Sequence, residues 1–101
     1  EKIVEKAITL AKKGTKNFYT TVDMDAMDAI YTPGALTPQF GGLTPAQITK
    51  AVRMVSMAGC GSIDISELVP ELDVADMTQR LAALLVMESL AGIAIRKIKK
   101  K

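Results

Sequence analysis

The chain contains no histidine and no tryptophan in its 101 residues, and it has a single cysteine, Cys60. Without histidine, it lacks the side chain that most often serves as a metal ligand or as a general base near neutral pH. A lone cysteine excludes an internal disulfide, which favours a reducing, cytoplasmic setting. Because a cysteine nucleophile usually depends on a histidine, we interpret Cys60 as a small buried residue.

Aromatic residues are also few, and the charges nearly balance. The chain has two tyrosines and two phenylalanines but is 49% hydrophobic, so its core is built from aliphatic side chains and a disordered chain is excluded. A net charge of +2 predicts no strong attraction for nucleic acid. The longest apolar run, 81–95, is too short to span a bilayer, so we expect no membrane partner. We interpret the basic tail as a solvated helix end, formed by Arg96, Lys97, Lys99, Lys100 and Lys101.

The hydrophobic periodicity alternates between the helical and the strand type along the chain. It predicts helices over 3–11, 45–58 and 75 to the mid-nineties, and strands over 18–23 and 62–68. Thr44, Pro45 and Gln47 form a helix-start signature with a capping box. The middle of the last helix, 81–87, is apolar nearly all round, so we expect it to be buried on more than one side.

Strands that alternate with helices are typical of βαβ units, which predicts an α/β fold with a parallel sheet. Two parallel strands make a poor sheet by themselves, and the chain begins without Met inside an expected helix. We therefore expect further strands to come from missing sequence or from another chain. Ligands gather at the carboxyl ends of such strands, where Asp23, Asp25 and Glu67 are predicted to lie.

Asp23 and Asp25 are two residues apart, a spacing that places side chains on one face of a strand. Two neighbouring carboxylates repel unless a cation or a proton lies between them. From the residues alone, a metal site and a solvated turn whose aspartates cap backbone groups are equally good interpretations. A haloacid-dehalogenase-type phosphatase is disfavoured, because its pattern has Gly and Thr after the second Asp, where this chain has Ala26 and Met27.

The wider order of motifs is more specific. The run V-D-M-D-A-M-D is followed by T-P-G-A-L-T-P, by F-G-G-L-T-P and by I-D-I-S-E-L-V-P-E-L-D, and then by an Ala/Leu-rich helix. In this order the motifs resemble the C-terminal part of the ureohydrolase family (arginases, agmatinases and formiminoglutamases) over about residues 17–95. The Pro33-Gly34 step is more similar to agmatinases than to arginases. Ala29 and Leu36 stand where the family usually has Pro and Gly, which leaves the substrate open.

The resemblance implies the C-terminal portion of a three-layer αβα parallel-sheet arginase-like fold, with residues 1–101 forming part of a single ureohydrolase domain. It implies that Asp23 bridges two Mn²⁺ ions, that Asp25 ligates one of them, and that Glu67 binds the substrate's guanidinium group. The implied activity is manganese-dependent hydrolysis of a guanidino C–N bond with release of urea, as from agmatine. Thr37 lies in a loop near the substrate without an assigned role, and Asp28 is interpreted as a brace of that loop.

The missing histidines limit what this chain does alone. The family takes its other metal ligands, two histidines and two aspartates, and a proton-transfer histidine from upstream motifs. We therefore expect the isolated chain to be inactive and to be completed by an N-terminal portion or a companion chain, in a homo-oligomer as is common among relatives. The alternative is a non-catalytic split or degenerate ureohydrolase module that acts in assembly and retains the carboxylates as remnants.

Overall fold

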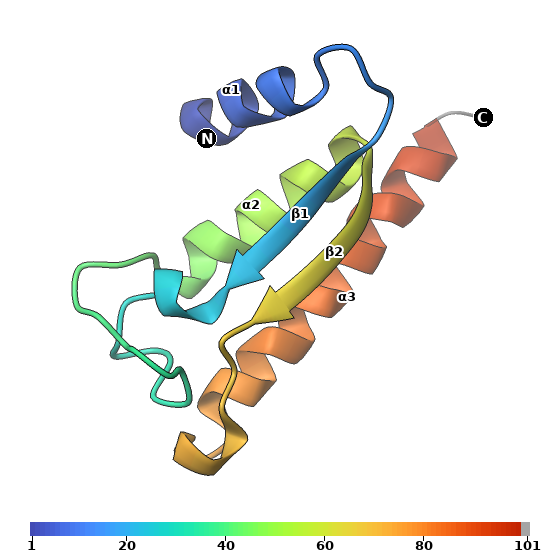
Figure 1. The fold of residues 1–101 in the computed structure, drawn as a ribbon. Coiled ribbons are helices and arrows are strands. Elements are labelled where there is room, and N and C mark those ends of the chain that lie inside the picture. The colour runs from blue at the N-terminus through green and yellow to red at the C-terminus, as the bar shows by residue number, and fades with distance from the viewer. Residues whose placement is uncertain (100–101) are drawn as a thin grey trace.

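The computed structural model describes residues 1–99 of the chain. Short 3-10 helices follow both strands, and three α-helices complete the structure (Figure 1). In chain order the elements are α1 (Lys2–Ala11), β1 (Phe18–Asp23), η1 (Met24–Ala26), α2 (Pro45–Ala58), β2 (Cys60–Ser66), η2 (Pro70–Leu72) and α3 (Met77–Lys99).

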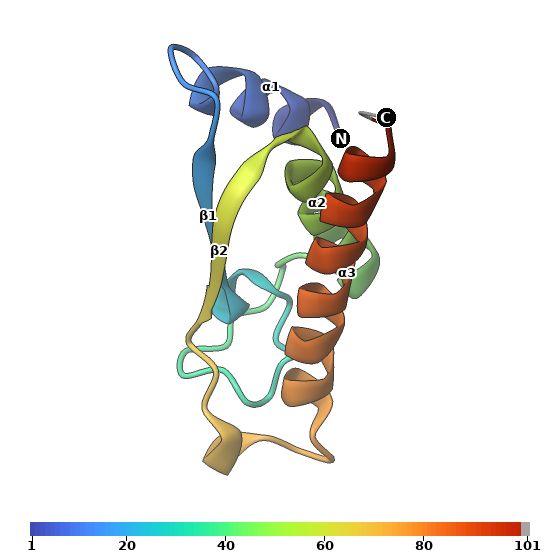
Figure 2. The ribbon, with the colours of Figure 1, turned by 90° about the vertical axis from the view of Figure 1, so that its right-hand side faces the viewer.

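The two strands pair in parallel, which confirms the predicted βαβ arrangement. The register pairs Phe18 with Cys60 and Asp23 with Ser66, so both strands end together. Figure 2 shows α2 and α3 on the same side of the two strands. On the other face Tyr19 is 59% exposed. Within the described residues, the chain therefore forms a two-layer portion of the expected three-layer fold.

The predicted start of α2 is confirmed in detail. Thr44 Oγ1 accepts a hydrogen bond from the Gln47 amide at 3.2 Å, and Gln47 Oε1 accepts one from the Thr44 amide at 3.0 Å. This capping box satisfies two amides that the first turn leaves unpaired. Gly59 ends the helix with a φ of 123°, a conformation that a residue with a Cβ rarely adopts.

Strand β2 lies two residues earlier than the alternation predicts. It begins at Cys60, directly after the helix stop, and it ends at Ser66. The strand ends there because Glu67 has a φ of 65°, which extended backbone does not allow. Cys60 is buried, as predicted, and its Sγ lies 3.1 Å from Thr20 Oγ1.

The core lies between the strands and helices α2 and α3. Its buried residues are aliphatic or methionine side chains, as the scarcity of aromatics predicts. They are Val22, Met24, Met27, Ala35, Ile48, Val52, Leu81, Ala82 and Leu85.

The expectation that α3 is buried on more than one side is wrong for this chain. Leu85 is fully buried, but Leu84, Met87 and Leu90 are between 41% and 66% exposed. Only one stripe of a helix reaches a single neighbouring layer, and no element of residues 1–99 covers the opposite stripe. Arg96, Lys97 and Lys99 form the last turn, whereas Lys100 and Lys101 lie outside the described residues. No helix in the described part of the chain is long and apolar enough to cross a membrane.

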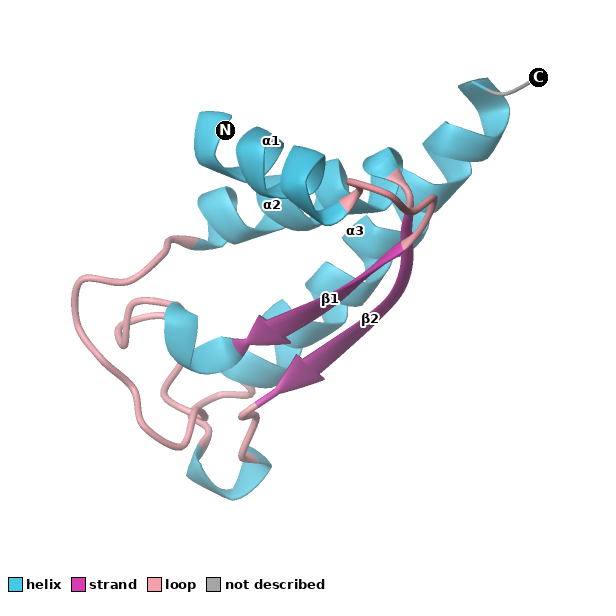
Figure 3. Cartoon of the chain, turned by 45° about the horizontal axis from the view of Figure 1, so that its top comes forward, coloured by secondary structure: helices cyan, strands magenta, loops and turns pink. Residues whose placement is uncertain are grey.

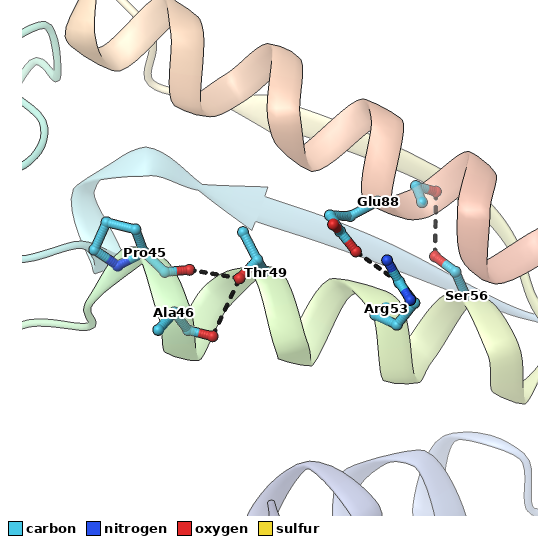
Figure 4. A network of polar contacts seen from close by, with 7 residues as sticks. Pro45, Ala46, Thr49, Arg53, Ser56 and Glu88 are labelled. Atoms are coloured by element: carbon cyan, nitrogen blue, oxygen red, sulfur yellow. Dashed lines mark hydrogen bonds and ion pairs between the residues drawn. The ribbon is translucent and has the colours of Figure 1, made fainter.

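Helices α2 and α3 meet along a polar seam (Figure 4). Arg53 Nε donates to Glu88 Oε2 at 2.6 Å, and Ser56 Oγ donates to Ser89 Oγ at 3.2 Å. Gly92 allows the close approach, because a Cβ there would lie 2.6 Å from Ser56 Cβ. The seam therefore sets how α3 lies along α2.

Candidate metal centre

The carboxyl ends of both strands open onto the long loop between η1 and α2 (Figure 3). The loop folds back on itself, because the Asp28 amide donates to Leu43 O at 2.9 Å and the Ala29 amide donates to Gln39 O at 2.8 Å. Gly42 permits this, since a Cβ there would lie 2.6 Å from the Met27 carbonyl carbon. Backbone hydrogen bonds therefore hold the loop in a folded shape beside the strand ends.

Asp23 is the last residue of β1, and its carboxylate caps the turn that follows. Asp23 Oδ1 accepts a hydrogen bond from the Asp25 amide at 2.8 Å. The side chain is exposed, and Oδ2 has no hydrogen bond within residues 1–99. A carboxylate offers about four acceptor positions, so Asp23 retains most of its capacity for a ligand.

Asp25 is held by a single residue of the loop. Thr37 donates through its amide to Asp25 Oδ1 at 3.2 Å and through its hydroxyl to Oδ2 at 2.8 Å. Two donors on one carboxylate fix its plane, and each oxygen still has an acceptor position free. Thr37 therefore orients the Asp25 carboxylate, a role that the sequence alone did not assign.

The structure corrects the reason given for the pairing of the two aspartates. Asp25 lies in the 3-10 turn η1 and not on the strand, because β1 ends at Asp23. The i, i+2 argument for a strand therefore does not apply. Asp23 caps a backbone amide, as the alternative interpretation of a turn stabilised by aspartates predicts. A metal role is still compatible with this contact, because both carboxylates keep unused acceptor positions.

Asp28 braces the loop, in agreement with its interpretation from the sequence. Asp28 Oδ1 accepts from the Ile30 amide at 3.1 Å and Oδ2 accepts from the Gly41 amide at 2.9 Å. Both oxygens thus bind backbone within the loop, which ties its beginning to its end.

Glu67 follows β2, one residue beyond the partner of Asp23 in the sheet register. Its side chain is exposed, and its left-handed backbone turns the chain toward the loop. There Ala35 pairs with Leu68, and the Val69 amide donates to Gly34 O at 2.6 Å. Asp23 thus ends β1, Asp25 lies in the turn that follows it, and Glu67 comes directly after the neighbouring strand, with one loop packed beside both strand ends.

Thr78 ties the loop to the start of α3, and Asp73, the last residue of the I-D-I-S-E-L-V-P-E-L-D motif, caps that start. The sequence assigned neither residue a role. The Gly34 amide donates to Thr78 Oγ1 at 2.8 Å. Asp73 accepts from the amides of Thr78 at 3.1 Å and Gln79 at 3.0 Å, and from Gln79 Nε2 at 3.1 Å. Partial burial acts to raise the pKa of Asp73, but the hydrogen bonds from Gln79 and Thr78 outweigh it and hold that pKa well below its ordinary value of 3.8. The sequence signals for Asp73 were its place at the end of that motif and its position shortly before a helix start.

The donor atoms fit manganese in kind but not in number. Carboxylate oxygens suit Mn²⁺ and Mg²⁺ better than thiolate-preferring metals. However, residues 1–99 contain no group of three or more Asp, Glu, His or Cys side chains placed to hold a metal ion. Asp23 and Asp25 therefore amount to part of a ligand set.

Comparison with known sequences places the chain in a family. The sequence profile of the Arginase family matches residues 1–92. The mitochondrial guanidino acid hydrolase of Homo sapiens is 36% identical over 80 residues, which cover 79% of this chain and 23% of that protein. The agmatinase of Cronobacter sakazakii is 36% identical over 84 residues, which cover 83% of this chain and 28% of that protein.

Solved structures agree with the sequences. The formimidoylglutamase of Bacillus subtilis matches with a TM-score of 0.86 and 29% identity, over 92% of this chain and 30% of that one. The arginase of Bacillus caldovelox matches with a TM-score of 0.80 and 32% identity, over 88% of this chain and 30% of that one. The structure is thus a portion of the arginase-like α/β fold with a parallel sheet. The chain belongs to the Arginase family, as the motif order predicts, and it spans less than a third of the length of these relatives.

Proposed function

We propose that this chain contributes one edge of the active site of a manganese-dependent hydrolase that cleaves a guanidino C–N bond and releases urea. The observation that carries the proposal is that Asp23, Asp25 and Glu67 lie at or just beyond the carboxyl ends of two neighbouring strands of a βαβ unit in an Arginase-family chain. Ligands of open parallel sheets bind at that edge.

Each residue has a defined part in the proposed reaction. Asp23 and Asp25 would hold manganese through oxygens that their present hydrogen bonds leave available. Bound manganese would supply a water nucleophile at neutral pH, because a metal ion lowers the pKa of bound water. Glu67, exposed beyond the end of β2, would bind the guanidinium group by charge-assisted hydrogen bonds. Water adds to the guanidino carbon, the bond to the substituted nitrogen breaks, and urea and a protonated amine are released.

Agmatine is the substrate we favour, and putrescine would be the other product. The Pro33-Gly34 step supports this choice, as does the 36% identity to an agmatinase. Guanidino acid hydrolases and formimidoylglutamases are similar at comparable identity, so a guanidino acid and formimidoylglutamate are the competing substrates. We further propose a cytoplasmic homo-oligomer in which the remaining ligands, including histidines, come from an N-terminal portion or a companion chain.

The test is an assay of the purified protein together with any polypeptide that copurifies with it. With Mn²⁺, it should release urea from agmatine faster than from a guanidino acid. Asp23→Asn should lower kcat by about 10³-fold or more, because it removes a ligand charge from the centre. Glu71→Gln, which removes one exposed carboxylate from η2, is the matched control and should leave kcat unchanged. The chain alone should show no urea release.

A non-catalytic assembly module is the second candidate. The capping role of Asp23 and the absence of a three-residue metal group in residues 1–99 favour it. It predicts that Asp23→Asn leaves the metal content of the purified complex unchanged, as measured by elemental analysis. Loss of bound manganese in that variant would reject the module interpretation.

A further inference from the structure

A second polar site lies at the end of the fold opposite the carboxylates. A cavity of about 470 Å³ opens where α2 ends and where both strands begin, at the amino ends of the sheet. Three cationic side chains line it, Lys12, Lys16 and Arg96, and none of its lining residues is acidic. They come from three separate segments, the end of α1, the loop before β1 and the last turn of α3.

The negative end of the α2 dipole offsets only part of this positive charge. Lys12 Nζ donates to Ala58 O at 2.8 Å, so one ammonium group binds a carbonyl that the helix end leaves unpaired. A helix C-terminus carries about half a negative charge, whereas three full positive charges surround it. The ion pairs in the described part of the chain, Lys50 with Glu1 and Arg53 with Glu88, involve none of the three. The cavity therefore keeps a surplus of positive charge.

Two of the three cations lie close to the space beside Gly59. A Cβ placed on Gly59 would lie 3.9 Å from Lys12 Nζ and 3.9 Å from Arg96 Nη1. An atom placed there would thus lie near two cations, and also 3.5 Å from the Lys16 carbonyl oxygen. Asn17 also lines the cavity and adds an uncharged donor.

We propose that this cavity binds a phosphoryl anion, at a site separate from the candidate metal centre. Arginine offers a planar pair of donors to a tetrahedral oxyanion and lysine adds a compact charge, which together are the usual donor set for phosphate. The cavity is larger than a single phosphate ion, so pyrophosphate or a phosphorylated small molecule fits its volume better. The proposal is independent of the activity proposed above, because it shares no residue with it.

The experiment is calorimetric titration of the protein, with any copurifying polypeptide, by pyrophosphate and by inorganic phosphate in a dilute chloride buffer. Arg96→Gln and Lys16→Gln should each raise the Kd for pyrophosphate by about tenfold, the effect of losing one charge-assisted contact. Lys2→Gln removes the same charge about 15 Å along α1 and should change the Kd by less than about twofold. Circular dichroism checks that each variant is folded, and Lys16→Gln replaces Arg96→Gln should the latter unfold.

Three outcomes overturn the proposal. One is no saturable binding of pyrophosphate by the unmodified protein. Another is an equal loss of affinity in Lys2→Gln and Arg96→Gln, which means diffuse attraction to net charge. The third is tighter binding of a short single-stranded DNA than of pyrophosphate, with sensitivity to Lys97 and Lys99, which assigns the surface to nucleic acid. A tenfold loss confined to Arg96→Gln and Lys16→Gln supports it.

Discussion

Replacing Asp73 by asparagine tests how its carboxylate stabilises the start of α3. The carboxylate accepts hydrogen bonds on both oxygens, from the amides of Val74 and Thr78 on Oδ1 and from Gln79 on Oδ2. Asparagine keeps one carbonyl oxygen but places an NH₂ group against the two donors of Gln79. Two hydrogen bonds are then lost at about 1 kcal/mol each, and the charge at the helix start adds about 0.3–1 kcal/mol. We expect the free energy of unfolding to fall by about 2–3 kcal/mol.

The lowered pKa of Asp73 determines how the stability difference between the two proteins changes with pH. The pKa of Asp73 is held below its ordinary value of 3.8 in the folded chain. The carboxylate therefore stabilises the fold fully above the unfolded pKa, and this contribution is lost as the pH falls below about 4 toward the folded pKa. The amide side chain of the Asp73→Asn variant does not titrate in this range. The difference in stability between the two proteins should accordingly shrink as the pH is lowered through this window.

Urea unfolding followed by circular dichroism measures both effects, at pH 7 and at intervals below pH 4. Glu71→Gln is the matched control, because it removes one negative charge from an exposed position two residues away. A loss below about 0.5 kcal/mol in Asp73→Asn at pH 7, or a loss that stays constant at low pH, would refute the reasoning. The first result would mean that the cap is not formed, and the second that its charge is irrelevant.

Three further predictions concern packing and the metal ligands. Leu85→Ala should lower the free energy of unfolding by about 2–5 kcal/mol, because Leu85 is fully buried. Leu90→Ala, at a 61% exposed position, should lower it by less than about 1 kcal/mol. Equal effects in urea unfolding would contradict the burial pattern. Gly92→Ala places a Cβ 2.6 Å from a side-chain carbon of α2, so it should destabilise by about 1–3 kcal/mol despite the better helix propensity of alanine; a rise in Tm would contradict the seam. Thr37→Val removes the hydroxyl that binds Asp25 and should weaken manganese binding by the complete enzyme about 10–100-fold, while Thr37→Ser should retain it; identical metal affinity in both variants would remove Thr37 from any positioning role.

Local features of the fold were predictable because they depend on neighbouring residues. The capping box of Thr44 and Gln47 and the stop at Gly59 involve groups within one helical turn. The parallel pairing followed from the alternation of elements. Element boundaries near Glu67 were less accurate, because its left-handed backbone depends on the loop that packs beside it.

The assignment of the site residues stays a prediction, whereas the structure decides their local geometry. The motif order alone singled out Asp23, Asp25 and Glu67. The structure has Asp23 at the end of β1, Asp25 in the turn after it and Glu67 directly after β2. Their supporting contacts join residues far apart in the chain, such as Thr37 with Asp25 and Thr78 with Gly34. No short sequence pattern encodes such contacts, because they depend on how the loop folds over the strand ends.

The sequence by itself determined the family, the helix caps, the aliphatic core and the lack of any imidazole for a metal centre. Tertiary structure alone decided that Asp25 leaves the strand and is oriented by Thr37. It also decided that, within residues 1–99, α3 is covered on one side, and that Lys12, Lys16 and Arg96 meet at one cavity. The physical reason is the same in each case. Propensities and caps act within a few residues, whereas burial and charge clustering depend on which distant surfaces the fold brings together.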